Sequence, residues 1–505
     1  MPSSILLQNA TVIVPSSRAS TDAVPLKGHS VLIEGNIITR IAPHADVKAP
    51  SADTEVIDCR GKIVSPGFVD THHHLWQTQL KGRHADQSLM EYMPSGNMQC
   101  ASYTAEDIFW GELGGCLASI DGGTTTVVDH AHMSYSAAHV ENAVSATISS
   151  GIRSIFCFTP TLRIKSWDPP FTADEEFFPA WVWETFDKLA QAAPFGDGRI
   201  QLGFAGELFF LPKEMIVNIF ERVTKAGVKT ITAHYLHGIY EQPLNQKQPI
   251  PSPDEDYNGV PLVDILHSYN LLGPNIILSH ATGLTPAAAQ KITSTGAFVS
   301  TTPETELQMG HGLPVCFRDD IKDQCSLGID CHSNNSSDMM TQMRLGLQSA
   351  RAVRNEALIK KGETPIVKIS GSVRDVFRLA TIEGARAVHL QDQIGSLVEG
   401  KRADIVVFDA LSPGMICAAE HDPIAAIVLH SSISDIETVI VDGVVRKRGG
   451  KLVKVAVDEG IAGIGKTEVA WADVAGELLR SREDIQKRIE KIDMDKALES
   501  FLKMV

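Results

Sequence analysis

Three consecutive histidines, His72, His73 and His74, follow an apolar run that predicts a buried strand. Alternate side chains of a strand share a face, so His72 and His74 point one way and His73 points the other way. Two imidazoles on one face can bind one cation, and neutral imidazole suits zinc and neighbouring metals. The pair does not complete a metal site, so other parts of the chain must supply further ligands.

Residues of metal-ligand types also stand at the C-terminal ends of other predicted strands. They are His130 and His132 after the second strand, His234 and His237 after the fifth, His280 after the sixth and Asp330 after the eighth. A histidine at one strand end is more often a structural hydrogen-bonding residue. Ligand types at five strand ends predict convergence, because the C-terminal ends of the strands of a barrel meet at one mouth.

The predicted metal ligands are His72, His74, His234 and Asp330, with water in an open position. Three nitrogens and a carboxylate suit zinc, and iron or manganese would also fit. The cation would lower the pKa of its water to about 7 and give hydroxide at neutral pH. We expect Asp330 to accept the proton and His280 to orient the hydroxide. The fourth strand ends without a lysine to bridge a second metal, so we predict one divalent ion.

Alternating apolar strands and helical patterns between residues 63 and 390 predict a (β/α)8 barrel of the TIM type. The eight predicted strands are Ile63–Val69, Thr124–Asp129, Arg153–Phe158, Ile200–Phe204, Lys229–Ala233, Asn275–Ser279, Ala297–Thr301 and Gln324–Ile329. The long first connection, 75–105, is a candidate cover for the site. A doubly wound open sheet is the alternative fold.

Short strands separated by turn residues occupy both ends of the chain. We expect residues 1–62 and 391–460 to form one small β-sandwich beside the barrel of residues 63–390. Residues 461–505 alternate charged and apolar residues at helical spacing, which predicts a surface or subunit-contact helix.

The composition, 43% hydrophobic and 21% charged, is that of a globular protein, and 505 residues predict more than one structural unit. The formal net charge of −16 argues against nucleic acid or an anionic membrane as partner. Eight cysteines without a Cys-x-x-Cys pair are typical of a reducing compartment. No signal-peptide pattern or membrane-length apolar run is present, so we expect a cytoplasmic protein with a small-molecule substrate.

The chain resembles the amidohydrolase superfamily, in the branch of cytosine, guanine and adenosylhomocysteine deaminases and triazine chlorohydrolases. The motifs that carry this resemblance are Pro-Gly-Phe-Val-Asp-Thr-His-His-His (66–74), Gly-Thr-Thr-Thr-Val-Val-Asp-His (123–130), His234, Leu-Ser-His-Ala-Thr-Gly (278–283), Leu-Gly-Ile-Asp (327–330) and the segment 394–409. The resemblance implies a mononuclear metal-dependent hydrolase that attacks a carbon–nitrogen bond of a cyclic amide or heteroaromatic amine. It also implies a homo-oligomer.

Two positions depart from this pattern. Relatives carry a glutamate three residues after the strand-five ligand to move protons to the leaving amine, and here His237 occupies that place. Histidine can carry protons near neutral pH. After strand seven, Glu306 stands where relatives often have asparagine. Glu304 and Glu306 are therefore candidates for the missing acid or for binding a basic substrate, with loop carboxylates at the barrel rim as the alternative.

Three residues near the first two strand ends are further candidates for substrate contact: Gln77, Trp76 and His130. A core position for Trp76 and a supporting hydrogen bond from His130 are the alternatives. The replacement of the strand-five acid by His237 leaves open a lyase, or a hydrolase of carbon–carbon or carbon–chlorine bonds, on the same metal site. A non-catalytic binding protein would have no need of an open metal position.

Overall fold

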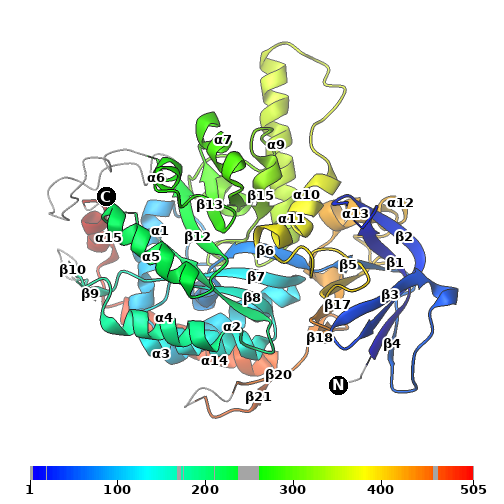
Figure 1. Cartoon of the computed structure of the whole chain (residues 1–505), viewed down its shortest axis with the longest axis horizontal. Helices are drawn as coiled ribbons and strands as arrows, with labels where there is room; N and C mark the ends of the chain where they lie inside the picture. Colours follow the sequence, from blue (N-terminus) through cyan, green and yellow to red (C-terminus); the bar gives the residue numbers. More distant parts are fainter. Residues whose placement is uncertain are drawn as a thin grey trace.

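Two large β-sheets form the frame of the protein in a computed structural model (Figure 1). The structure describes residues 4–18, 20–167, 172–174, 176–206, 208–209, 211–236, 261–458 and 464–503. One sheet has eight parallel strands and is surrounded by helices. The other has nine strands and lies at one side of the first.

The eight-stranded sheet is the predicted barrel. Its strands are β6 (Phe68–His73), β7 (Thr124–Ala131), β8 (Arg153–Phe158), β11 (Ile200–Ala205), β12 (Ile231–Leu236), β13 (Ile276–Thr282), β14 (Phe298–Thr301) and β15 (Cys325–Leu327), paired in chain order. A parallel bridge between His73 and Asp330 joins the two edges, and Asp330 N donates to His72 O at 2.8 Å. Sequential order and closed edges confirm the barrel and exclude a doubly wound open sheet.

Helices cover the outside of the barrel. They include α2 (Ala105–Asp121), α3 (Ala137–Ser150), α4 (Ala180–Ala192), α5 (Lys213–Lys225), α6 (Leu262–Ser268), α7 (Pro286–Thr295), α9 (Met339–Lys360), α10 (Val373–Leu379) and α11 (Ile382–Ala387). In α5 the buried residues Ile216, Ile219, Phe220 and Val223 recur at helical spacing. Such a stripe buries one face against the strands and leaves the other face in water.

The nine-stranded sheet joins the two ends of the chain. Its strands are β1 (Ser4–Pro15), β2 (Ala23–Glu34), β3 (Ile37–Pro43), β4 (Glu55–Asp58), β5 (Lys62–Pro66), β16 (Ile405–Asp409), β17 (Ile436–Val441), β18 (Val444–Arg448) and β19 (Lys451–Leu452). Strand β5 pairs with β1 in parallel and with β16 antiparallel. Side chains from both ends, such as Val12 and Ile405, share one buried cluster.

The predicted first barrel strand, Ile63–Val69, is wrong as a single strand. Its first part is β5 of the nine-stranded sheet, and only the part after Gly67 belongs to the barrel. A side chain at Gly67 would lie 2.2 Å from Thr125 Oγ1, so the chain can pass between the sheets only with glycine there. Strand β5 belongs to the nine-stranded sheet, so we infer that the boundary lies at Gly67 and not at 62/63. Both strands are buried, so the apolar pattern does not separate them.

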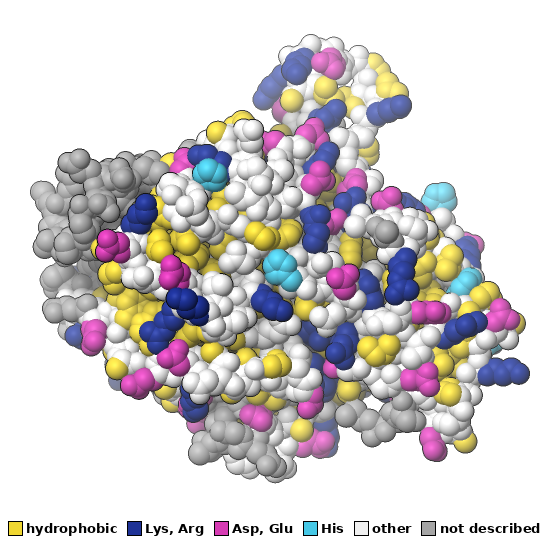
Figure 2. All heavy atoms as spheres, viewed as in Figure 1, with side chains coloured by type: hydrophobic (Ala, Val, Ile, Leu, Met, Phe, Trp, Pro, Cys, Tyr) yellow, Lys and Arg dark blue, Asp and Glu magenta, His cyan; other side chains and the backbone are white. Residues whose placement is uncertain are grey.

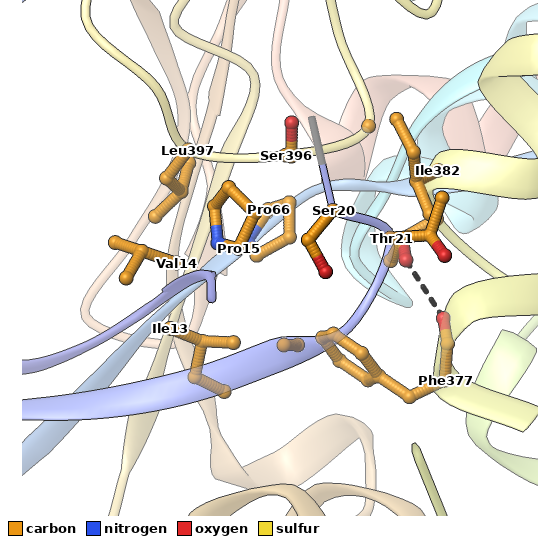
Figure 3. A pocket seen from close by; sticks show the side chains of 13 residues that line it. Ile13, Val14, Pro15, Ser20, Thr21, Pro66, Phe377, Ile382, Ser396 and Leu397 are labelled. Carbon is orange, nitrogen blue, oxygen red and sulfur yellow. Dashed lines mark hydrogen bonds between the residues drawn. The ribbon is translucent and has the colours of Figure 1, made fainter. Parts of the chain in front are cut away.

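The two sheets pack closely where they meet. A cavity of about 20 Å³ lies between the nine-stranded sheet and helices α10 and α11, lined by residues that include Ile13, Pro66, Phe377 and Leu397 (Figure 3). That volume holds one or two water molecules. This cavity is therefore too small for an organic substrate.

The C-terminal region, predicted as a helical tail, forms α14 (Trp471–Ile489) and α15 (Met494–Leu502). Helix α14 lies on α2 of the same chain, where Asp107 accepts hydrogen bonds from Ser481 Oγ and Arg488 Nη2, both at 2.6 Å. The first connection of the barrel contains η2 (Leu75–Leu80), α1 (Leu89–Ser95) and η3 (Asn97–Ser102). Among the described helices, none has the length and apolar character needed to cross a membrane.

Candidate metal centre

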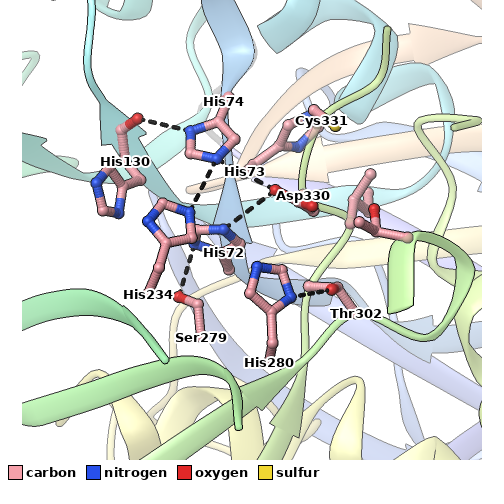
Figure 4. A network of polar contacts seen from close by, with 12 residues as sticks. His72, His73, His74, His130, His234, Ser279, His280, Thr302, Asp330 and Cys331 are labelled. Carbon is pink, nitrogen blue, oxygen red and sulfur yellow. Dashed lines mark hydrogen bonds and ion pairs between the residues drawn. The ribbon is translucent and has the colours of Figure 1, made fainter. Parts of the chain in front are cut away.

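Imidazoles and one carboxylate converge at the C-terminal mouth of the barrel (Figure 4). One ligand atom from each of His72, His234, His280 and Asp330 lies within 4.8 Å of the others. Asp330 Oδ1 lies 3.2 Å from His72 Nε2 and 3.1 Å from His74 Nε2. His234 Nε2 is 3.3 Å from His74 Nε2. The structure thus brings together the four residues that the sequence predicts as metal ligands, with His280 beside them.

The outer nitrogens of two of these imidazoles are held by neighbouring strands. His74 Nδ1 donates to the carbonyl oxygen of His130 at 2.9 Å, and His72 Nδ1 lies 2.9 Å from Ser279 Oγ. A backbone carbonyl only accepts, so His74 carries its proton on Nδ1 and turns the lone pair of Nε2 inward. Partners of this kind fix the ring orientation of metal-binding histidines.

The donor set fits a divalent cation. Burial lowers the pKa of His72 to about 3, so its imidazole is neutral. His72 Nε2 is buried and, within the described part of the chain, lacks a hydrogen bond of good geometry. Burial opposes ionisation of Asp330, yet His72 and His74 hold its pKa well below the usual value. Neutral imidazoles and an ionised carboxylate are the forms that bind a metal, and a cation would satisfy the lone pair of His72 Nε2.

His280 and Asp330 reach the site from strained backbone. Their φ angles are 72° and 71°, in the left-handed region that residues with a side chain rarely adopt. Such strain is concentrated at functional sites, where the surrounding structure enforces it. His280 Nδ1 lies 2.7 Å from Thr302 Oγ1, which leaves Nε2 as the nitrogen available to the metal cluster.

Glu306 lies behind His280. Its Oε1 accepts a hydrogen bond from Thr302 N at 2.7 Å and lies 3.7 Å from His280 Nδ1. Burial raises the pKa of Glu306 well above the ordinary value, because a carboxylate is poorly stabilised away from water. Glu306 therefore adjoins the site through Thr302 and His280.

Glu304 points elsewhere. Its Oε2 accepts from Gln342 Nε2 of α9 at 3.0 Å, and its backbone N donates to Gln342 Oε1, also at 3.0 Å. Both glutamates belong to a short helix, α8 (Pro303–Gln308), and not to the rim loop that was the alternative interpretation. Residues two apart on a helix point in different directions, which separates Glu304 from Glu306.

The other predicted substrate contacts lie at different depths. The ring of His130 is 4.5 Å from that of His234 and borders the cluster. Trp76 is fully buried, with its ring 5.0 Å from that of Tyr103. Gln77 is fully buried too, and its Nε2 donates to Tyr92 Oη at 2.5 Å. His237, the predicted replacement for the strand-five acid, lies outside the described residues.

His73 points away from the metal cluster, as expected for the middle residue of the triplet. Its Nδ1 lies 2.8 Å from Asp70 Oδ2 and its Nε2 lies 2.9 Å from His332 Nδ1. Asp70 Oδ1 also accepts from the backbone N of Ile329 at 3.1 Å. This buried chain of contacts ties β6 to the segment that carries Asp330.

The sequence analysis missed His311. Its ring centroid lies 4.8 Å from that of His280, at an interplanar angle of 85°. Neither ring nitrogen of His311 has a hydrogen-bond partner among the described residues. Gly310 and Gly312 flank it with φ angles of 79° and 119°. A histidine between two glycines was the available signal, because such a backbone can turn a side chain into a site.

Comparison with known proteins agrees with the resemblance found in the sequence and with the metal site of the structure. The model of the amidohydrolase family matches residues 63–446. The 5-methylthioadenosine/S-adenosylhomocysteine deaminase of Acetivibrio thermocellus is 27% identical over 444 residues, which cover 87% of this chain and 93% of the relative. The 5'-deoxyadenosine deaminase of Methanobrevibacter smithii is 25% identical over 463 residues, which cover 90% of this chain and 95% of the relative.

Two solved structures share the fold. An adenosine deaminase from Xanthomonas campestris with bound zinc has a TM-score of 0.74 at 21% identity and covers 96% of this chain and 98% of its own. An atrazine chlorohydrolase from Arthrobacter aurescens complexed with zinc has a TM-score of 0.74 at 18% identity, with 95% and 100% covered. The family model spans most of the barrel and its ligand cluster. The chain belongs to the amidohydrolase family and is a metal-dependent hydrolase of carbon–nitrogen bonds other than peptide bonds.

Proposed function

We propose that the protein is a zinc-dependent deaminase of an adenosine-like nucleoside. In this reaction water adds to the ring carbon that carries the amine, the carbon–nitrogen bond breaks, and ammonia leaves. The observation that carries the proposal is the convergence of His72, His74, His234 and Asp330 at the barrel mouth. The substrate class is supported by the relatives that are named as deaminases of 5-methylthioadenosine, S-adenosylhomocysteine and 5'-deoxyadenosine.

In this proposal His72, His74, His234 and Asp330 hold one zinc ion. When bound, zinc acts as a Lewis acid that lowers the pKa of water to about 7. Asp330 accepts a proton from the attacking water, because its carboxylate is ionised and central to the cluster. His280 hydrogen-bonds the oxygen through Nε2, while Thr302 fixes its Nδ1.

The leaving amine needs a proton, and the family glutamate that delivers it is absent. We assign that role to His311, with His237 as the second candidate. The His311 ring lies against His280, and neither of its nitrogens has a hydrogen-bond partner among the described residues. Glu306 acts only through Thr302 and His280, so it is a positioning residue.

Ammonia release tests the proposed function. The zinc-loaded protein is incubated with 5'-methylthioadenosine, S-adenosylhomocysteine, 5'-deoxyadenosine and adenosine, alongside aminopurines, pterins and triazines. We expect ammonia from at least one nucleoside and none with H72A protein. Turnover of a chlorotriazine, or carbon–carbon cleavage without ammonia, would replace the deaminase proposal by the alternative chemistry.

Metal analysis tests the zinc assignment separately. We expect one zinc per chain in protein purified without chelator, and a marked loss of bound zinc in H72A and H74A. Two metals per chain, or equal occupancy by iron, would contradict this part of the proposal while leaving the deaminase activity to its own test.

A cytoplasmic location is also proposed. All eight cysteines are free and seven are buried, with only Cys417 exposed. Unpaired thiols in this number suit a reducing compartment.

A further inference from the structure

Two buried carboxyl groups lie beside the first connection of the barrel and take no part in the proposed chemistry. On the face of the molecule shown in Figure 2, acidic side chains stand at the surface among basic ones. Glu112 of α2 and Asp129 of β7 are instead fully buried. A buried carboxylate is costly, because its charge loses the surrounding water. The core can therefore hold this pair only in a specific arrangement.

Glycines bring α2 into close contact with the chain that enters η2. A Cβ atom at Gly111 would lie 2.3 Å from the carbonyl oxygen of Trp76. A Cβ atom at Gly115 would lie 2.2 Å from the carbonyl oxygen of Leu75. Only glycine permits so close an approach of the two backbones. Glu112 follows the first of these glycines, so the same contact brings its carboxyl to this turn.

The carboxyls of Glu112 and Asp129 are hydrogen-bonded to each other. Thr147 Oγ1 donates to Glu112 Oε1 at 2.9 Å, and Leu75 N donates to Asp129 Oδ1 at 3.3 Å. The other two oxygens, Glu112 Oε2 and Asp129 Oδ2, receive no N–H or O–H donor from the described residues. Ionised carboxylates only accept hydrogen bonds, so these oxygens can bond to each other only if one carboxyl carries a proton.

The surroundings of the two carboxyls place this proton on Glu112. Burial, and then the facing Asp129, raise the pKa of Glu112 well above the ordinary value. Burial also raises the pKa of Asp129, but the N–H of Leu75 and the hydrogen bond from Glu112 favour its ionised form. Glu112 is therefore the donor of the hydrogen bond between the carboxyls, and Asp129 is the acceptor.

The bonded carboxyls are connected to a metal ligand through the backbone. Leu75, whose N–H is bound by Asp129, directly follows His74. His130, which directly follows Asp129, accepts a hydrogen bond from His74 Nδ1 at 2.9 Å through its carbonyl oxygen. His74 is the N-cap of η2 and makes no capping hydrogen bond with its own side chain. The end of β7 therefore holds both the ring of His74 and the peptide group that follows it.

We propose that Glu112 is a positioning residue of the metal site. The proton that Glu112 donates to Asp129 keeps that carboxylate on the N–H of Leu75, and the turn held in this way presents His74 to the cation. The inference rests on the proposed zinc site. Removing a hydrogen-bond partner of a metal ligand typically lowers metal affinity by about 10–100-fold, and Glu112 acts one step further from the metal.

Competition for zinc with a chromophoric chelator tests this role. E112A should lose about tenfold in zinc affinity, and E112L should lose as much, because leucine keeps most of the volume but donates no hydrogen bond. E112Q should stay within about threefold of wild type, because a glutamine amide can donate to Asp129 as a protonated glutamate does. L113A is the matched control, since it shortens a fully buried side chain of the same helix. It should lower thermal stability and leave zinc affinity unchanged.

Infrared spectroscopy tests the shared proton without zinc or turnover. Wild type should show the carbonyl band of a buried protonated carboxyl, which shifts in deuterium oxide and is missing from E112Q. Absence of that band from wild type would overturn the inference. Wild-type zinc affinity in E112A and E112L, a loss in E112Q as large as in E112A, or an equal loss in L113A would overturn it too. A wild-type chain that binds no zinc would contradict the proposed function as well, whereas the other outcomes leave that function standing.

Discussion

The hydroxyl of Ser279 is expected to control metal affinity although it is not a ligand. Ser279 Oγ lies 2.9 Å from His72 Nδ1, and both residues are fully buried. When His72 Nε2 binds a cation, its proton sits on Nδ1 and is donated to Ser279 Oγ. Removing that acceptor leaves a buried N–H group without a partner and frees the ring to rotate.

The expected effect of S279A is a 10- to 100-fold loss of zinc affinity, which corresponds to about 1.4–2.8 kcal/mol. The assay is competition for zinc with a chromophoric chelator at neutral pH. S300A is a matched control, because Ser300 is the register partner of Ser279 on β14 and is equally buried. Its hydroxyl contacts Thr71 Oγ1 at 2.7 Å instead of a ligand histidine.

Zinc affinity of S279A within threefold of wild type would refute the reasoning. An equal loss of affinity in S300A would refute it as well, because the loss would then come from a general disturbance of the barrel. A loss of thermal stability in both variants, with loss of zinc affinity in S279A alone, is the result that supports a specific role.

Three further predictions concern the metal, His311 and Glu304. Chelation should abolish activity and lower the free energy of unfolding by about 2.7 kcal/mol relative to protein with zinc at 100 times its Kd. Re-added zinc should restore both. An unchanged melting temperature would contradict a metal site that is part of the fold. H311A should lower kcat by about 10²–10⁴-fold with unchanged zinc content. The control H421A, at an exposed histidine, should leave kcat unchanged. Loss of zinc in H311A would instead indicate that His311 is a zinc ligand. Burial raises the pKa of Glu304 from 4.5 to about 7, so the folded state keeps this proton to a higher pH than the unfolded state does. The free energy of unfolding of the wild type should therefore fall by up to about 3 kcal/mol as the pH rises between these two values. Chemical unfolding as a function of pH should show that E304Q lacks this loss, and a parallel decline in both proteins would contradict the assignment.

The barrel and its ligand cluster follow from local sequence signals. Each strand is an apolar run, and at five of the eight a ligand-type residue stands near the C-terminal end, as His280 does in β13. The alternation of a strand places His72 and His73 on opposite faces, and the structure confirms that geometry. The two-residue period of a strand and the position of ligand-type residues near strand ends were sufficient for these predictions.

Other features depend on contacts that no local pattern reports. The break at Gly67 lies inside one apolar run because β5 and β6 are both buried, although in different sheets. Glu304 and Glu306 could be assigned to different surroundings only once α8 was known to be a helix. His311 stands alone between glycines and has no periodicity, so its approach to His280 depends on the course of the chain around it.

The bridge between His73 and Asp330 has a consequence for how the protein acquires its activity. The ligands His72 and His74 come from the first strand of the barrel, and Asp330 follows the last. The metal site therefore forms only after the first and last strands have come together and closed the barrel. During synthesis, no partial chain shorter than about 330 residues can form this site. A bound ion would link the first and last strands of the closed barrel.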